Sequence, residues 1–96
     1  MHIGFCRIQL RLYETKNLKA KRAVLLPLKS KLHRSFNIAC AETGDYDLPN
    51  SAVIGVSCVS NSGSHAKQVI DEVIRYLYSE GMGFQVVEVE SEIVTF

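Results

Sequence analysis

The sequence predicts an α+β fold, a ferredoxin-like βαββαβ plait with a four-stranded antiparallel sheet and two helices on one face. Four segments alternate apolar and polar residues with period two, and two segments repeat apolar residues at helical spacing. Their order along the chain is strand, helix, strand, strand, helix, strand, which is that of a split βαβ plait. The chain has 96 residues, of which 47% are hydrophobic, and we expect one domain over residues 1–96.

The first half of the chain predicts a strand, a helix and a second strand. The first strand covers residues 2–13, and one side of it carries Gly4, Cys6, Ile8, Leu10 and Leu12. Asn17 is a suitable N-cap for a helix with the apolar stripe Leu18, Leu25, Leu28, Leu32 and Phe36. Because Pro27 removes a backbone donor, we expect a kink there or a helix that begins later. Residues 36–42 predict the second strand, and 43–50 a turn-rich connection.

The second half predicts a strand, a helix and a last strand. Residues 51–60 form a strand whose apolar face is Ala52, Ile54, Val56 and Cys58. The helix over 61–81 is capped by Asn61, Ser62 or Ser64, and Gly81 suits its C′ position. Its inner face comprises Ala66, Val69, Ile70, Val73 and Leu77. The last strand, 83–94, places Val87, Val89 and Ile93 opposite Glu88, Glu90 and Glu92. In this plait the first and third strands are central, and the fourth borders the first.

Charge is distributed unevenly along the chain, although the net charge is only +1. Residues 15–36 carry seven Lys and Arg and no acid, whereas residues 71–92 carry six acids and one Arg. Local fields decay over roughly 8–10 Å, so a nearly neutral protein can still present a basic face. At about 100° per residue, one flank of the first helix carries Lys19, Arg22, Lys29 and His33 around Leu26.

We consider two hypotheses, the first based on this helix and the second on the open sheet face, and for the helix the alternative is an ordinary solvated surface. The first is contact with RNA, for which the candidate residues are Lys16, Lys19, Lys21, Arg22, Lys29, His33 and Arg34. The second is a protein-interaction or regulatory module that dimerises through the open sheet face. Its candidate interface residues are Ile3, Phe5, Arg7, Arg11, Val53, Glu88 and Glu90. We expect the two arginines of this set to pair with the glutamates of the last strand. Only Phe5 on that face is suited to stack on a base, which argues against an RNA-recognition motif.

The sequence contains no motif for catalysis, a cofactor or a metal ion. The cysteines at 6, 40 and 58 lie far apart, and we interpret them as reduced, buried hydrophobes. Ser62, Ser64 and His65 suggest a nucleophile and base, but capping of the second helix is the simpler account. Acids at 42, 45 and 47 are typical of a turn. No apolar run approaches the roughly 20 residues of a membrane span. We therefore expect a non-enzymatic cytoplasmic protein without a membrane segment.

With these segments in place, the chain resembles the YlxP-like family of small, poorly characterised bacterial proteins. The matching stretches are IGFCRIQLRL, NLKAKR at 17–22, FNIACAE at 36–42, VSN at 59–61 and VVEVESEI. The resemblance covers essentially the whole chain, with these stretches in the same order. Pro27 and the stretch SGS at 62–64 depart from the family pattern. The resemblance implies a ferredoxin-like fold, and recurring basic positions at Lys19, Lys21 and Arg22.

The resemblance also implies a biological setting. Genes of this family often lie beside genes for transcription and ribosome-maturation factors, including ribosome-binding factor A. This setting implies a role in ribosome assembly or RNA metabolism, with ribosomal RNA or a ribosomal subunit precursor as the partner. It supplies no catalytic residues that can be carried over to this chain.

Overall fold

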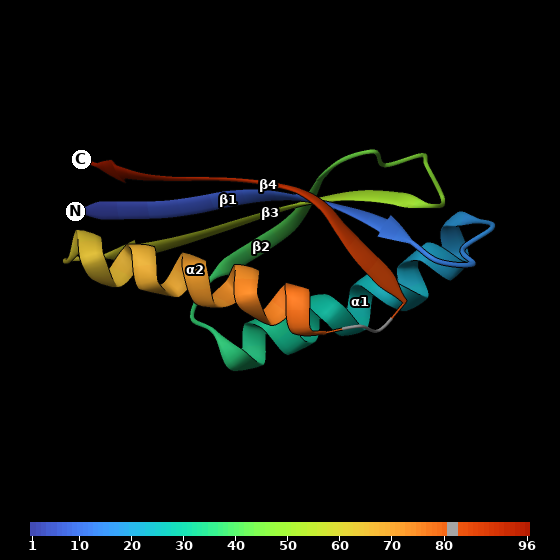
Figure 1. Ribbon diagram of the computed structural model, residues 1–96, viewed down its shortest axis with the longest axis horizontal. Coiled ribbons are helices and arrows are strands. Elements are labelled where there is room, and N and C mark those ends of the chain that lie inside the picture. Colours follow the sequence, from blue (N-terminus) through green and yellow to red (C-terminus); the bar gives the residue numbers. More distant parts are fainter. Residues whose placement is uncertain (81–82) are drawn as a thin grey trace.

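The chain folds as a sheet with two helices on one of its faces. The computed structural model describes residues 1–80 and 83–96. Its elements are β1 (His2–Leu12), α1 (Leu18–Ser35), β2 (Ala39–Gly44), β3 (Ser51–Ser60), α2 (Gly63–Ser79) and β4 (Phe84–Thr95). The strands form one antiparallel sheet in the order β2-β3-β1-β4. Both helices lie below the sheet in Figure 1, and its upper face is open. The predicted ferredoxin-like plait is confirmed, including the central position of β1 and β3.

The core lies between the helices and the inward faces of the two central strands. Every second residue of β1 and β3 is buried, as the alternation predicts: Cys6, Ile8, Leu10, Leu12, Ala52, Ile54, Val56 and Cys58. α2 contributes Ala66, Ile70, Val73 and Leu77 at its predicted spacing, and α1 contributes Leu25, Leu28 and Leu32. These side chains form one contiguous cluster, so hydrophobic burial fixes both helices on the same face of the sheet.

α2 approaches the sheet most closely at Gly4 of β1. A Cβ atom on Gly4 would lie 2.8 Å from Cγ1 of Ile70 and 3.1 Å from the carbonyl oxygen of Ala66. Neither atom is the free end of an exposed side chain, since both belong to buried residues of α2. Glycine at this position therefore sets the spacing between β1 and the first half of α2.

α1 is one uninterrupted helix of 18 residues that includes Pro27. Its N-cap is Asn17, as predicted, and the side-chain oxygen accepts a hydrogen bond from the amide of Ala20 at 2.8 Å. The expected later start of the helix is therefore wrong. Proline deprives the carbonyl four residues earlier, that of Ala23, of its helical donor. Both Ala23 and Pro27 lie on the exposed side of α1, where water replaces the missing donor.

The second strand begins three residues later than the sequence predicts. Residue 36 is the C-cap of α1, and its ring packs edge-to-face on Tyr76 of α2, with ring centroids 5.7 Å apart. An aromatic pair of this kind stabilises by about 0.5–1.5 kcal/mol beyond the area that it buries. Phe36 therefore joins the two helices, and β2 spans Ala39–Gly44 rather than 36–42.

The last strand contains a β-bulge that changes which valine faces the core. Gln9 pairs with Glu88, whereas Leu10 pairs with Val86, so β4 has one extra residue between these pairs. Val86 packs against the core and Val87 is 55% exposed. The predicted inward position of Val87 is wrong, whereas Val89 and Ile93 do pack against the core. Alternation alone could not reveal an added residue within a run of consecutive apolar side chains.

α2 is capped by one of the three predicted residues. Ser62 is the N-cap, and its hydroxyl accepts a hydrogen bond from the amide of His65 at 3.3 Å. The predicted C′ residue, Gly81, lies outside the described residues. None of the described helices is long and apolar enough to cross a membrane.

The three cysteines are free thiols, of which two are buried and one is half-buried. Cys6 and Cys58 are buried, and Cys40 is half-buried on β2. Burial raises the pKa of the Cys6 thiol to about 12, and it also raises the pKa of Cys40, against which the positive charge of Lys29 acts. The thiolate is the reactive species of cysteine. Burial therefore lowers the reactivity of Cys6 and Cys40 in two ways, because it covers the sulfur and keeps the thiol protonated.

We predict that Gly4→Ala lowers the free energy of unfolding by about 1–3 kcal/mol, because the added methyl overpacks the contact with α2. Gly63→Ala is the matched control. Its Cβ would lie 3.3 Å from the His2 ring at the surface, and alanine is favoured over glycine within a helix. Urea denaturation of both variants measures the difference. Equal stability of the two variants would contradict the close packing at Gly4.

We also predict that the thiols react in a fixed order with a disulfide reagent at pH 8. Cys40 should react first, because it is the most exposed of the three, although more slowly than free cysteine. Cys6 should react only as fast as the protein opens. Mass spectrometry of the labelled peptides over time measures the order. Rapid labelling of Cys6 in the folded protein would disprove the assignment.

Candidate nucleic-acid interface

α1 is the only described helix whose outward side carries cations without acids. Leu25, Leu28 and Leu32 fix its orientation, because their burial turns the opposite side to solvent. The outward cations of α1 are four exposed residues and the half-buried Lys29, and a further exposed lysine, Lys16, lies just before the N-cap. We call this set the basic face, and it comprises Lys16, Lys19, Arg22, Lys29, His33 and Arg34. Six of the seven residues predicted for RNA contact therefore share one accessible side of the molecule.

The cations of the basic face form no ion pair within the described part of the chain. Four other cations do have carboxylate partners, in the pairs Arg7–Glu90, Lys21–Glu42, Lys31–Glu80 and Lys67–Asp71. The first turn of α1 also lacks an acid, and it carries Lys19 at the end where the helix dipole is positive. A cation there costs about 0.3–1 kcal/mol, which an incoming anion would relieve.

Lys21, the seventh predicted residue, is not accessible to a nucleic acid. Its side chain is 3% exposed, and its ammonium group lies 2.8 Å from Oε2 of Glu42 on β2. The same group donates a hydrogen bond to the carbonyl oxygen of Asp45 at 2.7 Å. Asp45 in turn accepts a hydrogen bond from the hydroxyl of Ser51, which fixes the start of β3. Lys21 thus ties α1 to the β2–β3 connection, because its Cα lies at the margin of the apolar stripe.

Leu26 is the one large apolar residue that the basic face surrounds, and it is 59% exposed. The helical spacing places it between Arg22 and Lys29. An exposed leucine alone is ordinary, but one surrounded by cations suits a ligand that has both an anionic backbone and apolar surface. Ribose and base faces of a nucleic acid supply that surface.

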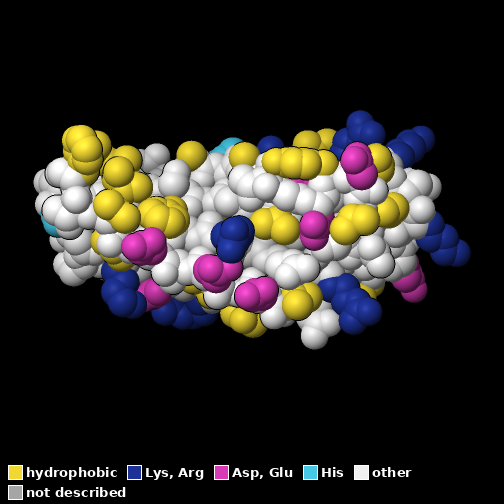
Figure 2. Space-filling model, turned by 90° about the horizontal axis from the view of Figure 1, so that it is seen from above, with side chains coloured by type: hydrophobic (Ala, Val, Ile, Leu, Met, Phe, Trp, Pro, Cys, Tyr) yellow, Lys and Arg dark blue, Asp and Glu magenta, His cyan; other side chains and the backbone are white. Residues whose placement is uncertain are grey.

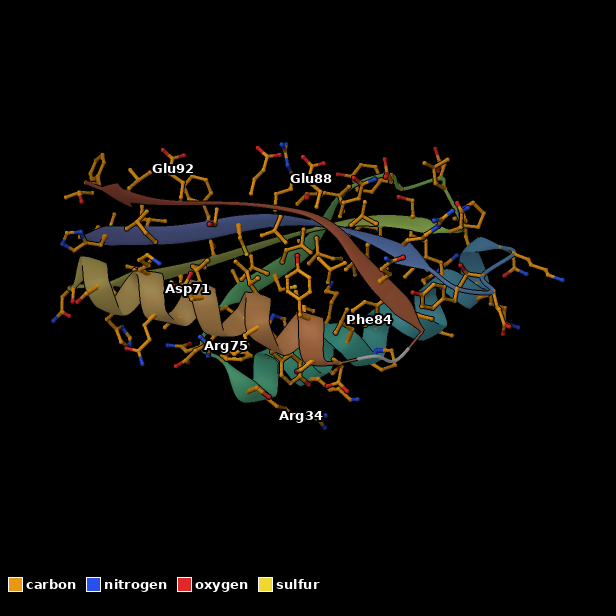
Figure 3. All side chains as sticks on the ribbon, viewed as in Figure 1. Arg34, Asp71, Arg75, Phe84, Glu88 and Glu92 are labelled. Atoms are coloured by element: carbon orange, nitrogen blue, oxygen red, sulfur yellow. The ribbon has the colours of Figure 1, made fainter. Side chains whose placement is uncertain are left out.

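The open sheet face carries both signs of charge, with three glutamates of β4 beside Arg7 and Arg11 of β1. Glu88, Glu90 and Glu92 lie on β4, and Figure 3 shows Glu88 and Glu92 above the sheet, with Arg34 on the helix side. Arg7 pairs with Glu90, as predicted. Arg11 lies opposite Gln85 rather than a glutamate, so the predicted pairing of Arg11 is wrong in this register. The hydrogen bond that Arg7 donates to Glu90 is the main cause that raises the pKa of Arg7, so this guanidinium stays charged.

The residues predicted for the alternative interface all lie on this open face, together with residues that the sequence did not single out. Beside Phe5 and Arg7 the face contains a hollow of about 690 Å³. Its other side is lined by small residues of β2 and β3, namely Ala39, Ala41, Thr43, Gly55 and Ser57. The sequence did not predict this hollow, because the predicted bounds of β2 were displaced. The pairing of residues 39–44 with β3 could not be derived from the pattern alone.

The serine and histidine residues at the start of α2 form hydrogen bonds around the N-cap of this helix. Ser60 Oγ lies 3.1 Å from Nδ1 of His65, and it also accepts a hydrogen bond from the amide of Ser62. Ser62 and Ser64 hydroxyls are 3.0 Å apart. Among the described residues, no carboxylate contacts the His65 ring, and no group of three metal-binding side chains is placed to hold an ion. These contacts account for the local hydrogen-bond donors without a catalytic role.

We predict that Lys21→Met lowers the free energy of unfolding by about 2–3 kcal/mol. Breaking a fully buried ion pair costs roughly 3–5 kcal/mol. The cost is smaller here, because the side chain of Glu42 is 28% exposed. Lys19→Met, on the basic face, is the matched control and should change stability by no more than about 0.5 kcal/mol. Chemical denaturation of both variants measures the difference, and equal values would show that the pair contributes nothing.

Comparison with known proteins gives a family without a described activity. Residues 3–91 match the family model described as a protein of unknown function, DUF503. The chain is also similar to the protein named "Uncharacterized protein YlxP" of Bacillus subtilis (strain 168). The two are 29% identical over 77 residues, which cover 80% of this chain and 84% of that relative. The family model spans both helices and all but the last residues of β4, so this chain belongs to the DUF503 family.

Proposed function

We propose that this protein is a non-enzymatic accessory protein of ribosome assembly or RNA metabolism, which contacts ribosomal RNA or a ribosomal precursor through the basic face of α1. The observation that supports this proposal is the basic face, whose cations have no ion-pair partner among the described residues, in a protein of net charge +1. A helix that served only as solvated surface would normally mix both signs, because pairs three or four residues apart stabilise it.

The dimensions of the basic face suit a phosphate backbone. From Lys19 to His33 the basic face extends over 15 residues of α1, which corresponds to about 21 Å at 1.5 Å per residue. Successive phosphates on one strand are separated by several ångströms, so three or four contacts fit along this length. Each contact releases counterions, which makes the affinity fall steeply with salt.

The distribution of charge also sets the orientation of the complex. The glutamates of the open face would repel a polyanion, whereas the basic face on the helix side would attract it. Contacts to phosphates position a protein without reading sequence, so selectivity for one RNA would come from its shape or from a further protein. The gene neighbourhood that the family resemblance implies favours ribosomal RNA. This role needs no catalytic residue and no cofactor.

We predict that the triple variant Lys19→Glu, Arg22→Glu, Lys29→Glu loses association with ribosomal subunits and their precursors. Co-sedimentation over a salt series is the measurement. For the wild type, the logarithm of the binding constant should fall with the logarithm of salt concentration by about 0.7–0.9 per phosphate contact. The fold should persist in the triple variant, because the three side chains lie outside the core.

The matched control is the variant Arg11→Glu, Lys67→Glu, Arg75→Glu, which makes the same change in net charge outside α1. It should retain most of the binding at moderate salt, where long-range effects are screened. Equal loss in both variants would show a nonspecific effect of net charge. Unchanged binding of the α1 variant would disprove the proposed contact.

A further inference from the structure

The open sheet face is divided into a half with large side chains and a half with small ones. The outward residues of β1 and β4 include Phe5, Arg7, Glu90 and Glu92. The outward residues of β2 and β3 beside them are Ala39, Ala41, Gly55 and Ser57. The methyl carbon of Thr43 lies 2.8 Å from the place where a Cβ on Gly55 would stand, and the hollow of about 690 Å³ lies between this half and the side chains of Phe5, Arg7, Glu90 and Glu92. The half of the face over β1 and β4 therefore protrudes, and the half over β2 and β3 is recessed.

We propose that two copies of this chain pack face to face through their open sheets, with the large half of each copy over the small half of the other. The two-fold axis runs parallel to the strands, between β1 and β3. In this arrangement Phe5 of each copy enters the hollow of the other. The proposal is independent of RNA contact, which uses the opposite side of the molecule.

The strand register supports this axis. A two-fold axis along the strands leaves each residue at the same position along the strand direction. It places β1 of one copy over β3 of the other, and β4 over β2. Phe5 pairs with Ser57 at one height, and Arg7 pairs with Gly55 at another. Phe5 and Arg7 of one copy therefore meet the small β3 residues of their own rows, Ser57 and Gly55, in the other copy. Packed sheets lie about 10 Å apart and are rotated by about 30°, so the match is closest in these central rows.

Apolar side chains at one end of the same face would also be covered. Ile3 pairs with Val59 on one side and with Val94 on the other, which makes one apolar row across three strands. Val59 is 69% exposed, and Phe96, just beyond β4, is 86% exposed. Figure 2 shows apolar side chains gathered at the end where Figure 1 places both termini. The proposed axis places this end over the same end of the other copy, so the two apolar rows meet.

The charges discriminate between the two possible in-plane axes. A two-fold across the strands would put β4 over β4 and bring the glutamates at 88, 90 and 92 of both copies together, at a cost of several kcal/mol. The axis along the strands places them over the neutral residues of β2. Arg7 keeps its ion pair with Glu90 within each chain. Glu88 and Glu92 lie on an edge strand, so they reach water at the rim of the interface.

The size of the face suits a stable pair. The chain measures 42 × 21 × 18 Å, and the sheet is seen edge-on in Figure 1, which is viewed along the shortest dimension. The open face thus extends over about 42 by 18 Å, close to the roughly 800 Å² that each partner contributes to a standard interface. The sheet edges are poorer candidates, because β2 has six residues and both β2 and β4 contain irregular registers.

The first test is the mass of the wild-type protein in solution, measured by sedimentation equilibrium from about 5 to 500 µM. We expect a transition from 10.7 kDa to twice that mass within this range. A protein that stays at 10.7 kDa at the highest concentration overturns the proposal. Circular dichroism confirms that each variant described next is folded before its mass is interpreted.

The second test exchanges the large and the small residue. Ser57→Phe fills the hollow and places two phenyl rings against each other, and we expect the dissociation constant to rise at least tenfold. The double variant Phe5→Ser, Ser57→Phe exchanges knob and hollow, and it should recover dimerisation to within about threefold of the wild type. Gln68→Phe on α2 is the control for an added aromatic ring outside the interface and should leave the mass unchanged.

An unchanged dissociation constant for folded Ser57→Phe overturns the interface, and a folded double variant that stays monomeric overturns the proposed axis. The α1 variant with Lys19→Glu, Arg22→Glu and Lys29→Glu should still dimerise, because these residues lie on the helix side. Loss of RNA binding and loss of dimerisation are therefore separate results, and either proposal can fail alone.

Discussion

The buried ion pair of Lys21 with Glu42 is the constraint on which the orientation of α1 depends. α1 packs its leucines over the β2 side of the sheet, and apolar contacts alone permit a helix to roll by small angles. The ammonium group of Lys21 has two fixed partners, on β2 and in the connection after it, which determine the rotation. A buried ion pair is weak evidence for stability but can specify one geometry. Here the geometry that it specifies turns the remaining cations of α1 to solvent.

The two faces of the molecule thus differ in charge although the net charge is near zero. The helix side carries cations without partners among the described residues, and the sheet side carries glutamates on an edge strand. Such a separation gives the protein a dipole moment perpendicular to the sheet. The field of a polyanion would therefore orient the protein before any contact forms. A dimer built through the sheet would leave both basic faces on the outside.

The sequence predicted the element order, the central strands and nearly every buried residue, because period and burial are coupled in β1, β3 and α2. It failed where a tertiary contact decided the local structure. Phe36 packs on Tyr76, which delays β2, and the extra residue in β4 turns Val87 outward. For the candidate site, the exposed cations were predictable from helical spacing. The burial of Lys21 was not, because a helical wheel shows neither Glu42 nor the carbonyl oxygen of Asp45 that accepts its hydrogen bond.

The bulge in β4 has a consequence for how related sequences should be compared. Phe84 and Val86 face the core before it, whereas Val89 and Ile93 face the core after it, so the inward positions change from even to odd numbers. In a relative that lacks the extra residue, the inward positions of β4 are all even or all odd. They therefore agree with those of this chain on only one side of the bulge. An alignment without a one-residue gap at this place would match core residues to surface residues. The position of that gap is therefore set by the pairing of β4 with β1, and identity scores alone would misplace it.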